Sequence, residues 1–171
     1  MQQPRRVIIT GASSGIGAAL ARRYAQQGAV LGLIARRAPT LRQIAAQLST
    51  RCETYPADVR DAASLAAAAR DFIGRHGCPD IVIANAGVSV GTLTDFAKDT
   101  RAFQDVIDTN VIGMVNTFQP FLAGMRERGS GALVGIASVA GYRGLPGAAA
   151  YSTSKAAAIS YLESLRVELA A

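Results

Sequence analysis

Two side chains near the end of the sequence have the types and the spacing of a proton-transfer pair. Tyr151 and Lys155 stand four residues apart in a segment with a helical pattern, so both project from one helix face. Free tyrosine has a pKa of about 10, too high for ready proton transfer at neutral pH, and a nearby cation lowers it. Ser138 ends a predicted strand and is placed to hydrogen-bond a substrate oxygen. Together the three predict acid–base catalysis, whereas the pair by itself is more typical of a surface helix.

A glycine-rich segment near the N-terminus, T-G-A-S-S-G-I-G from Thr10 to Gly17, follows one predicted strand and precedes a helix. Glycines let the backbone turn sharply and approach an anion closely, and the helix start offers free N–H groups and a positive dipole end. The segment therefore predicts a cradle for the pyrophosphate of a dinucleotide. The spacing G-x-x-x-G-x-G differs from the general G-x-G-x-x-G fingerprint, so a tight structural turn is the alternative. The predicted contacts are Gly11, Ser13, Ser14, Gly15, Ile16 and Gly17.

The same segment also matches the nucleophile elbow of serine hydrolases, G-x-S-x-G, with Ser13 as the nucleophile. Hydrolysis would need a histidine beside Ser13. The single histidine of the sequence, His76, ends a helix that leads into the fourth predicted strand, so it belongs at the opposite edge of the sheet. We therefore expect no catalytic triad, and we expect His76 to be a surface residue at a helix C-terminus.

The next two strand ends predict how the adenosine part of the dinucleotide binds. An NAD site usually carries an acidic residue after the second strand, where this sequence has Arg36 and Arg37. Arginine suits a 2′-phosphate by charge and by bidentate geometry, and the two serines of the glycine turn could donate to the same group. This favours NADP(H) over NAD(H), the alternative being two solvated arginines. After the third strand, Asp58 and Val59 are placed for the adenine ring, with Asp58 accepting from its amine.

Alternating strands and helices must position these residues. The apolar strands are continuous, as in strands buried on both faces, which predicts an α/β fold: a Rossmann-type, doubly wound parallel sheet with helices on both faces. Ligands of such sheets bind at the carboxyl ends of the strands. We expect a single dinucleotide-binding domain over residues 1–171. The predicted strands are 7–9, 30–35, 54–57, 81–84 and 132–137; the predicted helices are 15–27, 39–48, 62–76, about 100–128 with an interruption at Pro120, and 149–169.

Composition excludes several other classes of protein. The net charge is +6, but the arginines come singly or in pairs and few aromatic residues lie among them, so we expect no nucleic-acid partner. We find no signal peptide and no apolar segment long enough for a bilayer, which predicts a cytoplasmic protein with no membrane partner. Cys52 and Cys78 have no metal-ligand spacing, and we expect two reduced thiols and no metal site.

Taken in order, the motifs resemble those of the short-chain dehydrogenase/reductase family across essentially the whole sequence. No single motif is decisive, but the ordered set is specific. The resemblance implies an NADP-dependent oxidoreductase that transfers a hydride between the nicotinamide cofactor and a carbonyl or alcohol substrate. The matching positions are the turn Thr10–Gly17, then Asp58-Val59, Asn85-Ala86-Gly87, Asn110, Ser138, Tyr151 and Lys155.

The family resemblance also implies a role for each residue. Tyr151 is the general acid in reduction and the general base in oxidation, and Lys155 additionally binds the nicotinamide ribose. Asn110 helps to hold a water relay to Lys155. Asn85, with Ala86 and Gly87, positions the cofactor. Members often pair through the long helix and the last helix, which implies a homodimer or homotetramer.

The end of the sequence departs from the family pattern. Family members continue with further strands and helices that complete the sheet, contact the nicotinamide carboxamide and form most of the substrate lid. We therefore expect this chain to be C-terminally truncated, a fragment of a longer protein. The alternative function is a dinucleotide-binding or scaffold protein without turnover.

Overall fold

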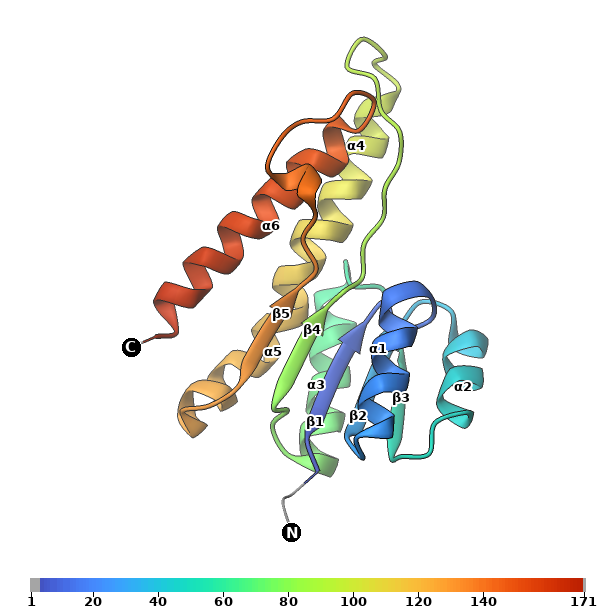
Figure 1. Cartoon of the computed structure of the whole chain (residues 1–171), viewed down its shortest axis with the longest axis vertical. Coiled ribbons are helices and arrows are strands. Elements are labelled where there is room, and N and C mark those ends of the chain that lie inside the picture. Colours follow the sequence, from blue (N-terminus) through green and yellow to red (C-terminus); the bar gives the residue numbers. More distant parts are fainter. Residues whose placement is uncertain (1–3, 171) are drawn as a thin grey trace.

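The computed structural model describes residues 4–170, which form a five-stranded parallel sheet flanked by helices (Figure 1). The strand order is β3-β2-β1-β4-β5, so the order reverses between β1 and β4. The prediction of a Rossmann-type parallel sheet is thus confirmed. The strands are β1 (Arg6–Thr10), β2 (Val30–Ala35), β3 (Cys52–Pro56), β4 (Ile81–Ala84) and β5 (Ala132–Gly135).

Helices cover both faces of the sheet because successive strand residues point to opposite sides. Val7 and Ile9 of β1 pack in one apolar cluster, and Ile8 between them packs in the other. The first cluster lies under α1 (Gly15–Gln26) and α2 (Ala38–Ala46). The second lies under α3 (Ala62–His76), α5 (Gly113–Arg128) and α6 (Ala149–Glu168). The bounds of α1, α2, α3 and α6 lie within two residues of those predicted from the sequence, whereas the predicted helix at about 100–128 is divided into three segments.

The predicted interruption of the long helix at Pro120 is wrong, because α5 continues through that residue. A proline inside a helix removes one backbone hydrogen bond and crowds the preceding turn. Here the neighbouring Phe118 and Phe121 are fully buried in the core, and their packing stabilises the helix on both sides of the proline. The irregularity lies upstream instead, between α4 (Asp99–Ile107) and α5.

That irregularity is a π-helical turn, η1 (Asp108–Ile112), which joins α4 and α5 without a break. Such turns are rare and frequently lie at functional sites. The next residue is Gly113, and a Cβ there would lie 2.5 Å from Cγ2 of Val59. The turn therefore packs directly against the loop that follows β3, and it brings buried Asn110 toward the sheet.

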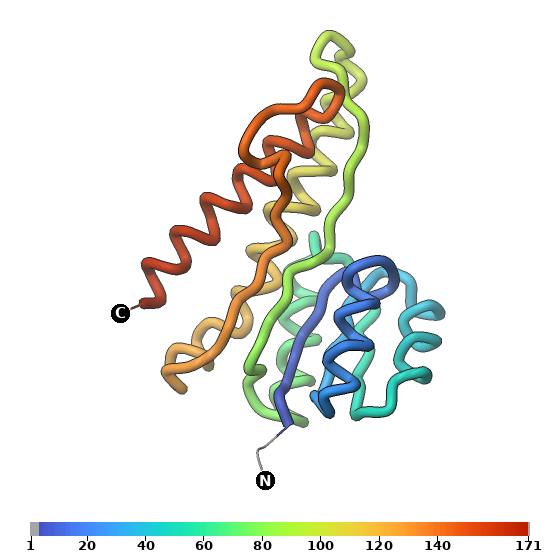
Figure 2. The backbone as a smooth tube through the Cα atoms, in the orientation of Figure 1, coloured from blue at the N-terminus to red at the C-terminus, as the bar shows by residue number. Residues whose placement is uncertain are grey.

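A long excursion separates β4 from α4. Figure 2 shows residues 85–98 leaving β4 and running beside the start of α6 before they turn back into α4. Thr92 fixes this path, since its N–H donates to the carbonyl of Gly147 (3.0 Å) and it forms an isolated bridge with Ala148. The 3-10 turn η2 (Val139–Gly141) lies on the other connection, between β5 and α6.

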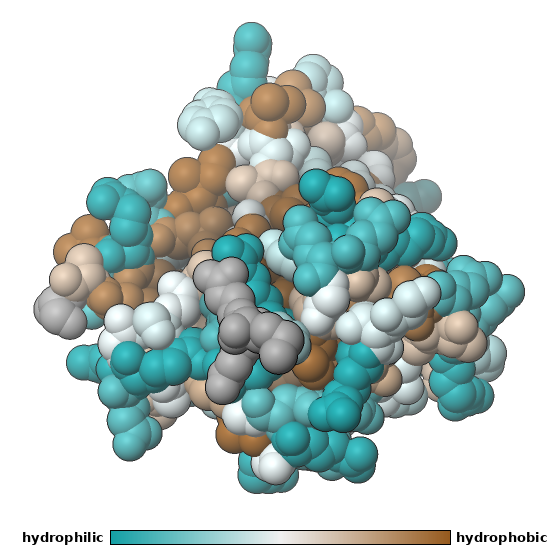
Figure 3. Space-filling view, turned by 60° about the horizontal axis from the view of Figure 1, so that its bottom comes forward, coloured by the Kyte–Doolittle hydropathy of each residue, from teal (hydrophilic) through white to brown (hydrophobic). Residues whose placement is uncertain are grey.

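β5 forms one edge of the sheet and is only partly covered. Val134 of β5 is 37% exposed, although it pairs with Ile83, which is buried. In the space-filling view of Figure 3, apolar colour gathers between the left edge and the centre, while polar atoms dominate the lower face.

Within residues 4–170, no helix is both long and apolar enough to cross a membrane.

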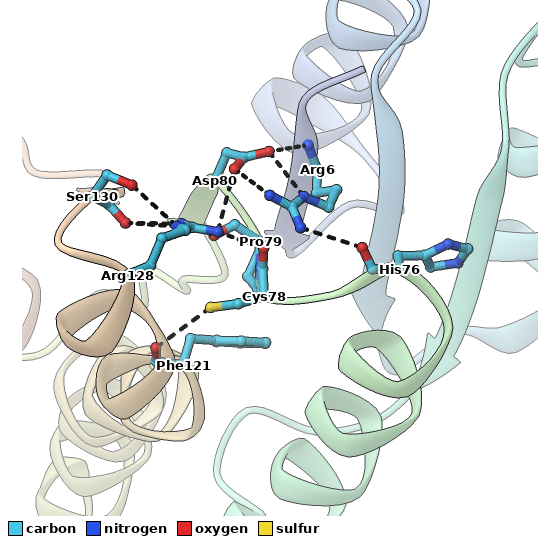
Figure 4. A network of polar contacts seen from close by, with 8 residues as sticks. All are labelled: Arg6, His76, Cys78, Pro79, Asp80, Phe121, Arg128 and Ser130. Carbon is cyan, nitrogen blue, oxygen red and sulfur yellow. Dashed lines mark hydrogen bonds and ion pairs between the residues drawn. The ribbon is translucent and has the colours of Figure 1, made fainter. Parts of the chain in front are cut away.

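A charged network around Asp80 connects the amino-terminal ends of neighbouring strands (Figure 4). Arg6 donates to the Asp80 carboxylate through Nη2 (2.8 Å), Nε (3.1 Å) and its backbone N–H (2.8 Å). The Arg128 guanidinium lies 3.4 Å from the same carboxylate and donates to the carbonyls of Cys78 and Pro79. Burial alone would raise the pKa of Asp80, but its bonds to the two arginines outweigh that effect and lower it. The network joins β1, β4 and the end of α5.

We expect Asp80→Asn to lower the free energy of unfolding at pH 7 by about 1–2 kcal/mol, because the amide keeps the shape but loses the charge-assisted bonds. A carboxyl whose pKa is lowered by folding stabilises above its unfolded pKa, and the contribution disappears as pH falls through the folded pKa. Urea denaturation should thus show the gap between wild type and variant closing below about pH 4.

The control is Glu163→Gln, which breaks an exposed pair with Arg166 and should change stability by less than about 0.5 kcal/mol. A gap for Asp80→Asn that stays constant down to about pH 2 would contradict the assignment of the network to this carboxylate.

Candidate functional site

A cleft of about 430 Å³ opens at the carboxyl ends of the strands, where the strand order reverses. This is the place where open parallel sheets bind ligands. The lining residues come from the ends of all five strands, from η1 and from α6. They are Gly11, Ser13, Ser14, Ile16, Ala35, Arg36, Arg37, Ala57, Asp58, Val59, Asn85, Ala86, Gly87, Val88, Ser89, Thr109, Ile136, Tyr151 and Lys155.

The turn after β1 is shaped for close approach of a ligand to the backbone. Gly11 has φ +65°, and a Cβ there would lie 2.8 Å from Cα of Ala86, so a larger residue would collide with the next strand end. Gly17 lies behind the turn, where a Cβ would lie 2.4 Å from the carbonyl oxygen of Gly11. Ser14 begins α1, and within residues 4–170 no side chain caps this helix. The first N–H groups of α1 therefore face the cleft edge as donors for an anion.

Thr10 joins the ends of β1 and β4, a role that the sequence analysis missed. Its Oγ1 accepts from the N–H groups of Asn85 (3.1 Å) and Ala86 (3.2 Å), and its side chain is fully buried. The Asn85 side chain donates back to the carbonyl of Thr10 (3.0 Å). Asn85 thus lines the cleft as predicted, while its amide group also fixes the two strand ends relative to one another. A threonine at the end of an apolar strand is the only sequence signal for this role.

The two arginines after β2 differ in their surroundings. Nη2 of Arg37 donates to Oγ of Ser13 (3.2 Å), which ties the second strand end to the glycine turn. Arg36 also lines the cleft and is exposed, and among the described residues its side chain has no hydrogen bond or ion pair. A guanidinium at a cleft wall with its donors unused is suited to a phosphate.

The loop after β3 brings Asp58 beside these arginines. Ala35 at the end of β2 pairs with Pro56 at the end of β3, and its carbonyl accepts from the N–H of Ala57 (3.1 Å). Asp58 therefore lines the cleft at the same end as Arg36. Its pKa is lowered, mainly by hydrogen bonds from Arg60 and to a smaller extent by the charge of Arg36. The Val59 carbonyl accepts from Nδ2 of Asn116 (3.0 Å), which fixes the loop to α5.

The other end of the cleft holds Tyr151 and Lys155 on α6. Nζ of Lys155 lies 5.5 Å from the centroid of the Tyr151 ring, so the two side chains share a helix face as predicted. Lys155 is only 6% exposed and donates to the carbonyl of Ile136 (2.6 Å), beyond the end of β5. Burial lowers the pKa of the Lys155 ammonium. The Lys155 side chain is therefore largely shielded from solvent while its Nζ lies beside the Tyr151 ring.

Ser138 lies two residues beyond Ile136, outside the residues that line the cleft. Its Oγ accepts from the N–H of Ala140 (3.2 Å), so the side chain begins the η2 turn. The structure brings Ser138 to the same strand end as the carbonyl that holds Lys155, without placing it in the cleft wall.

Asn110, the other predicted catalytic residue, uses its side chain as a tie between three segments. Its Oδ1 accepts from the N–H of Val88 (2.8 Å), and its Nδ2 donates to the carbonyl of Val88 (2.9 Å) and to Oγ of Ser154 (2.9 Å). Ser154 in turn donates to the carbonyl of Tyr151 (2.7 Å). Asn110 thus connects η1, the loop after β4 and α6, while its neighbour Thr109 lines the cleft.

His76 is not the surface residue that the sequence predicted. Its side chain is only 7% exposed, because the ring packs against Phe72 (centroids 5.0 Å apart) and Nε2 lies 3.1 Å from Oε1 of Glu53. Ser13 is bonded to Arg37 and His76 to Glu53, so the two residues needed for hydrolysis have different partners. Within residues 4–170 the arrangement gives no support to a hydrolase.

The residues of the cleft fit a nicotinamide dinucleotide from end to end. The glycine cradle and the uncapped start of α1 suit a pyrophosphate. Arg36 and Asp58 suit the adenosine part on one side, and Lys155 suits hydroxyl groups on the other. The fit rests on the shape of the cradle and on the donors and acceptors that face the cleft.

Comparison with known proteins agrees with this geometry. The family model described as "short chain dehydrogenase" matches residues 5–171. An "Uncharacterized oxidoreductase" of Myxococcus xanthus is 40% identical over 168 residues, which cover 96% of this chain and 66% of that protein. A Sphingomonas protein named "2-dehydro-3-deoxy-L-rhamnonate dehydrogenase (NAD(+))" is 37% identical over 166 residues, covering 97% of this chain and 66% of the relative.

Solved structures give the same result. A short-chain dehydrogenase from Streptomyces avermitilis superposes with a TM-score of 0.91 at 34% identity, covering 99% of this chain and 62% of that one. An alcohol dehydrogenase from Thermococcus sibiricus, complexed with 5-hydroxy-NADP, superposes with a TM-score of 0.89 at 30% identity, covering 97% and 72%. The chain thus spans just under two thirds of the Myxococcus protein and of the Streptomyces structure.

The hydrogen bonds of the Asn110 side chain predict a large loss of stability when that side chain is removed. We expect Asn110→Ala to lower the free energy of unfolding by about 2–4 kcal/mol, because the partly buried N–H and C=O of Val88 both lose their partner and so does the buried Ser154 hydroxyl. Thr109→Ala, next to it in the same turn, removes only a local bond to the Asp105 carbonyl and should cost less than about 1 kcal/mol. Urea denaturation of both variants checks this, and equal losses would contradict the role of Asn110 as a tie.

Proposed function

This chain belongs to the short-chain dehydrogenase family, and we propose that the protein is an NADP(H)-dependent oxidoreductase acting on a carbonyl or alcohol substrate. One observation carries the proposal. A single cleft has an arginine with unused donors at the adenosine end and an ammonium beside a phenol at the other end. The first arrangement suits a phosphorylated dinucleotide, and the second suits proton transfer to an oxygen.

The cofactor, when bound, supplies or accepts the hydride. In the direction of reduction, the Tyr151 hydroxyl gives its proton to the oxygen of the substrate; in oxidation the phenolate takes a proton from the alcohol. The Lys155 ammonium stabilises the phenolate and donates to hydroxyl groups of the cofactor, while the Ile136 carbonyl holds its position. Ser138 is proposed as the donor to the substrate oxygen, and Asn110 as the residue that keeps α6 and η1 in place around the proton path.

The choice of cofactor is proposed from Arg36 rather than from the relatives. The Sphingomonas relative is named as an NAD(+) enzyme, and the Thermococcus structure contains a derivative of NADP. Relatives of this chain thus differ in their cofactor. Arg36 supports NADP(H) because it lines the cleft and its guanidinium has no hydrogen bond or ion pair among the described residues, so its donors are available to a phosphate. The cytoplasmic location and the homodimer or homotetramer stay predictions.

We expect Arg36→Gln to weaken NADPH binding by about ten-fold or more, since a charge-assisted bond to phosphate is lost, and to change NADH binding by less than about two-fold. Titration of cofactor fluorescence with the purified chain measures both affinities. Arg42→Gln, on the exposed side of α2, is the matched control. Equal effects of Arg36→Gln on the two cofactors would contradict the assignment of Arg36 to the 2′-phosphate.

We expect Tyr151→Phe to abolish turnover, by about 10³-fold or more, while NADPH affinity changes by less than about two-fold, because the variant loses only the hydroxyl that exchanges the proton. The measurement is a screen of ketones, aldehydes and alcohols with both cofactors, followed by the variant on any substrate found. Undiminished turnover would contradict the acid–base role. Cofactor binding without turnover on any substrate would favour a non-catalytic dinucleotide-binding protein.

A further inference from the structure

Both oxygens of the Asp58 carboxylate accept hydrogen bonds from one residue, Arg60, which is not among the residues that line the cleft. Oδ1 of Asp58 accepts from the backbone N–H of Arg60 (3.0 Å) and from its Nε (3.1 Å). Oδ2 accepts from Nε (3.2 Å) and from Nη2 (2.7 Å). Arg60 thus holds both oxygens in a fork-like arrangement, which fixes the orientation of the carboxylate as well as its charge state.

Arg60 is itself anchored on a second element. Its Nη1 lies 3.6 Å from Oδ1 of Asp105 on α4, and Nε of Arg101 lies 3.5 Å from the same oxygen. An isolated exposed ion pair contributes little, but a bidentate pair within a network is more ordered. The side-chain bond from Arg60 is the largest cause that lowers the pKa of Asp58, so this carboxylate stays ionised and paired.

The position of this pair creates an electrostatic problem for the proposed cofactor. Asp58 shares its end of the cleft with Arg36, because the ends of β2 and β3 are neighbours in the sheet. A 2′-phosphate bound to Arg36 would bring between one and two negative charges to the end of the cleft that Asp58 also lines. An uncompensated like charge there would weaken binding even in partly exposed surroundings. NADH lacks that phosphate and would be affected much less.

We propose that Arg60 is a positioning and specificity residue: it cancels the charge of Asp58 and fixes its orientation, so that one cleft end accepts both an adenine amine and a 2′-phosphate. The inference rests on the proposed function and adds to it the residue that makes Asp58 and Arg36 compatible. Arg60 lies outside the cleft lining and acts through Asp58.

The test is a double-mutant cycle on cofactor affinity, measured by fluorescence titration at low salt with NADPH and NADH. Arg60→Met should weaken NADPH binding by about five-fold and NADH binding by less than about two-fold. In an Asp58→Asn background, the same change should alter NADPH affinity by less than about two-fold, since no charge remains to be cancelled. Arg60→Lys should recover part of the affinity, because it restores the charge without the fork.

Arg101→Met is the matched control, because it removes a positive charge from the same network without touching Asp58, and it should leave both affinities unchanged. A second measurement needs no cofactor: carbon NMR of the free chain should show the pKa of the Asp58 carboxyl rising in Arg60→Met. An unchanged pKa would overturn the inference.

The outcomes separate this inference from the proposed function. A wild-type chain that binds neither cofactor, or prefers NADH, contradicts the proposed function and the present inference with it. A wild-type preference for NADPH that Arg60→Met leaves intact overturns only the inference. A loss of NADPH affinity that persists in the Asp58→Asn background also overturns it, because Arg60 would then contact the cofactor directly.

Discussion

The hydroxyl of Thr10 joins the carboxyl ends of β1 and β4, and the cleft depends on this junction because the sheet order reverses between these two strands. Two parallel strands diverge beyond their last ladder bond unless something satisfies the next backbone groups. Oγ1 of Thr10 accepts two of these N–H groups, and the Asn85 amide returns a bond to the carbonyl of Thr10. The glycine turn can then lie against the end of β4 with a fixed gap, which is what a pyrophosphate cradle requires.

A second set of hydrogen bonds links that geometry to α6, the helix that carries the proposed acid–base pair. Asn110 satisfies both backbone groups of Val88 and also Ser154, one residue before Lys155. The π turn makes this possible, since it directs the Asn110 side chain toward the loop after β4 within an otherwise continuous helix. Lys155 is held from the opposite side by the Ile136 carbonyl. Helix α6 is thus tied to the loop after β4 through Asn110 and to the end of β5 through Lys155.

Charge is distributed unevenly along the cleft. Among the described residues, the cations of the adenosine end have three different situations: Arg37 is bonded to the glycine turn, Arg60 to Asp58, and Arg36 to no protein group. A guanidinium without a protein partner offers its full charge to a ligand. A guanidinium that is bonded to a protein group instead fixes the position of that group. The net charge of +6 therefore does not indicate which arginines can bind a ligand in the cleft, whereas the hydrogen bonds and ion pairs of each arginine do.

The sequence by itself determined the order of strands and helices and the parallel sheet, because continuous apolar strands alternate with amphipathic helices and few topologies satisfy that pattern. It also determined which strand ends carry the glycine turn, the arginines and Asp58, since local motifs of this kind depend on neighbours in the chain. Local rules failed at Pro120, where the helix continues beside buried phenylalanines, and at His76, whose ring packs against Phe72 and lies beside Glu53 of β3.

Only the tertiary structure decided which polar groups meet across long distances in the chain. The bonds from Thr10 to Asn85 and from Asn110 to Ser154 join residues far apart in sequence, and their types alone are compatible with many partners. The same holds for the two arginines after β2: both line the cleft, but Arg37 is bonded to Ser13, whereas Arg36 has no hydrogen bond or ion pair among the described residues. Secondary structure follows from short-range sterics and periodic burial, whereas the pairing of polar side chains follows from the packing of the whole chain.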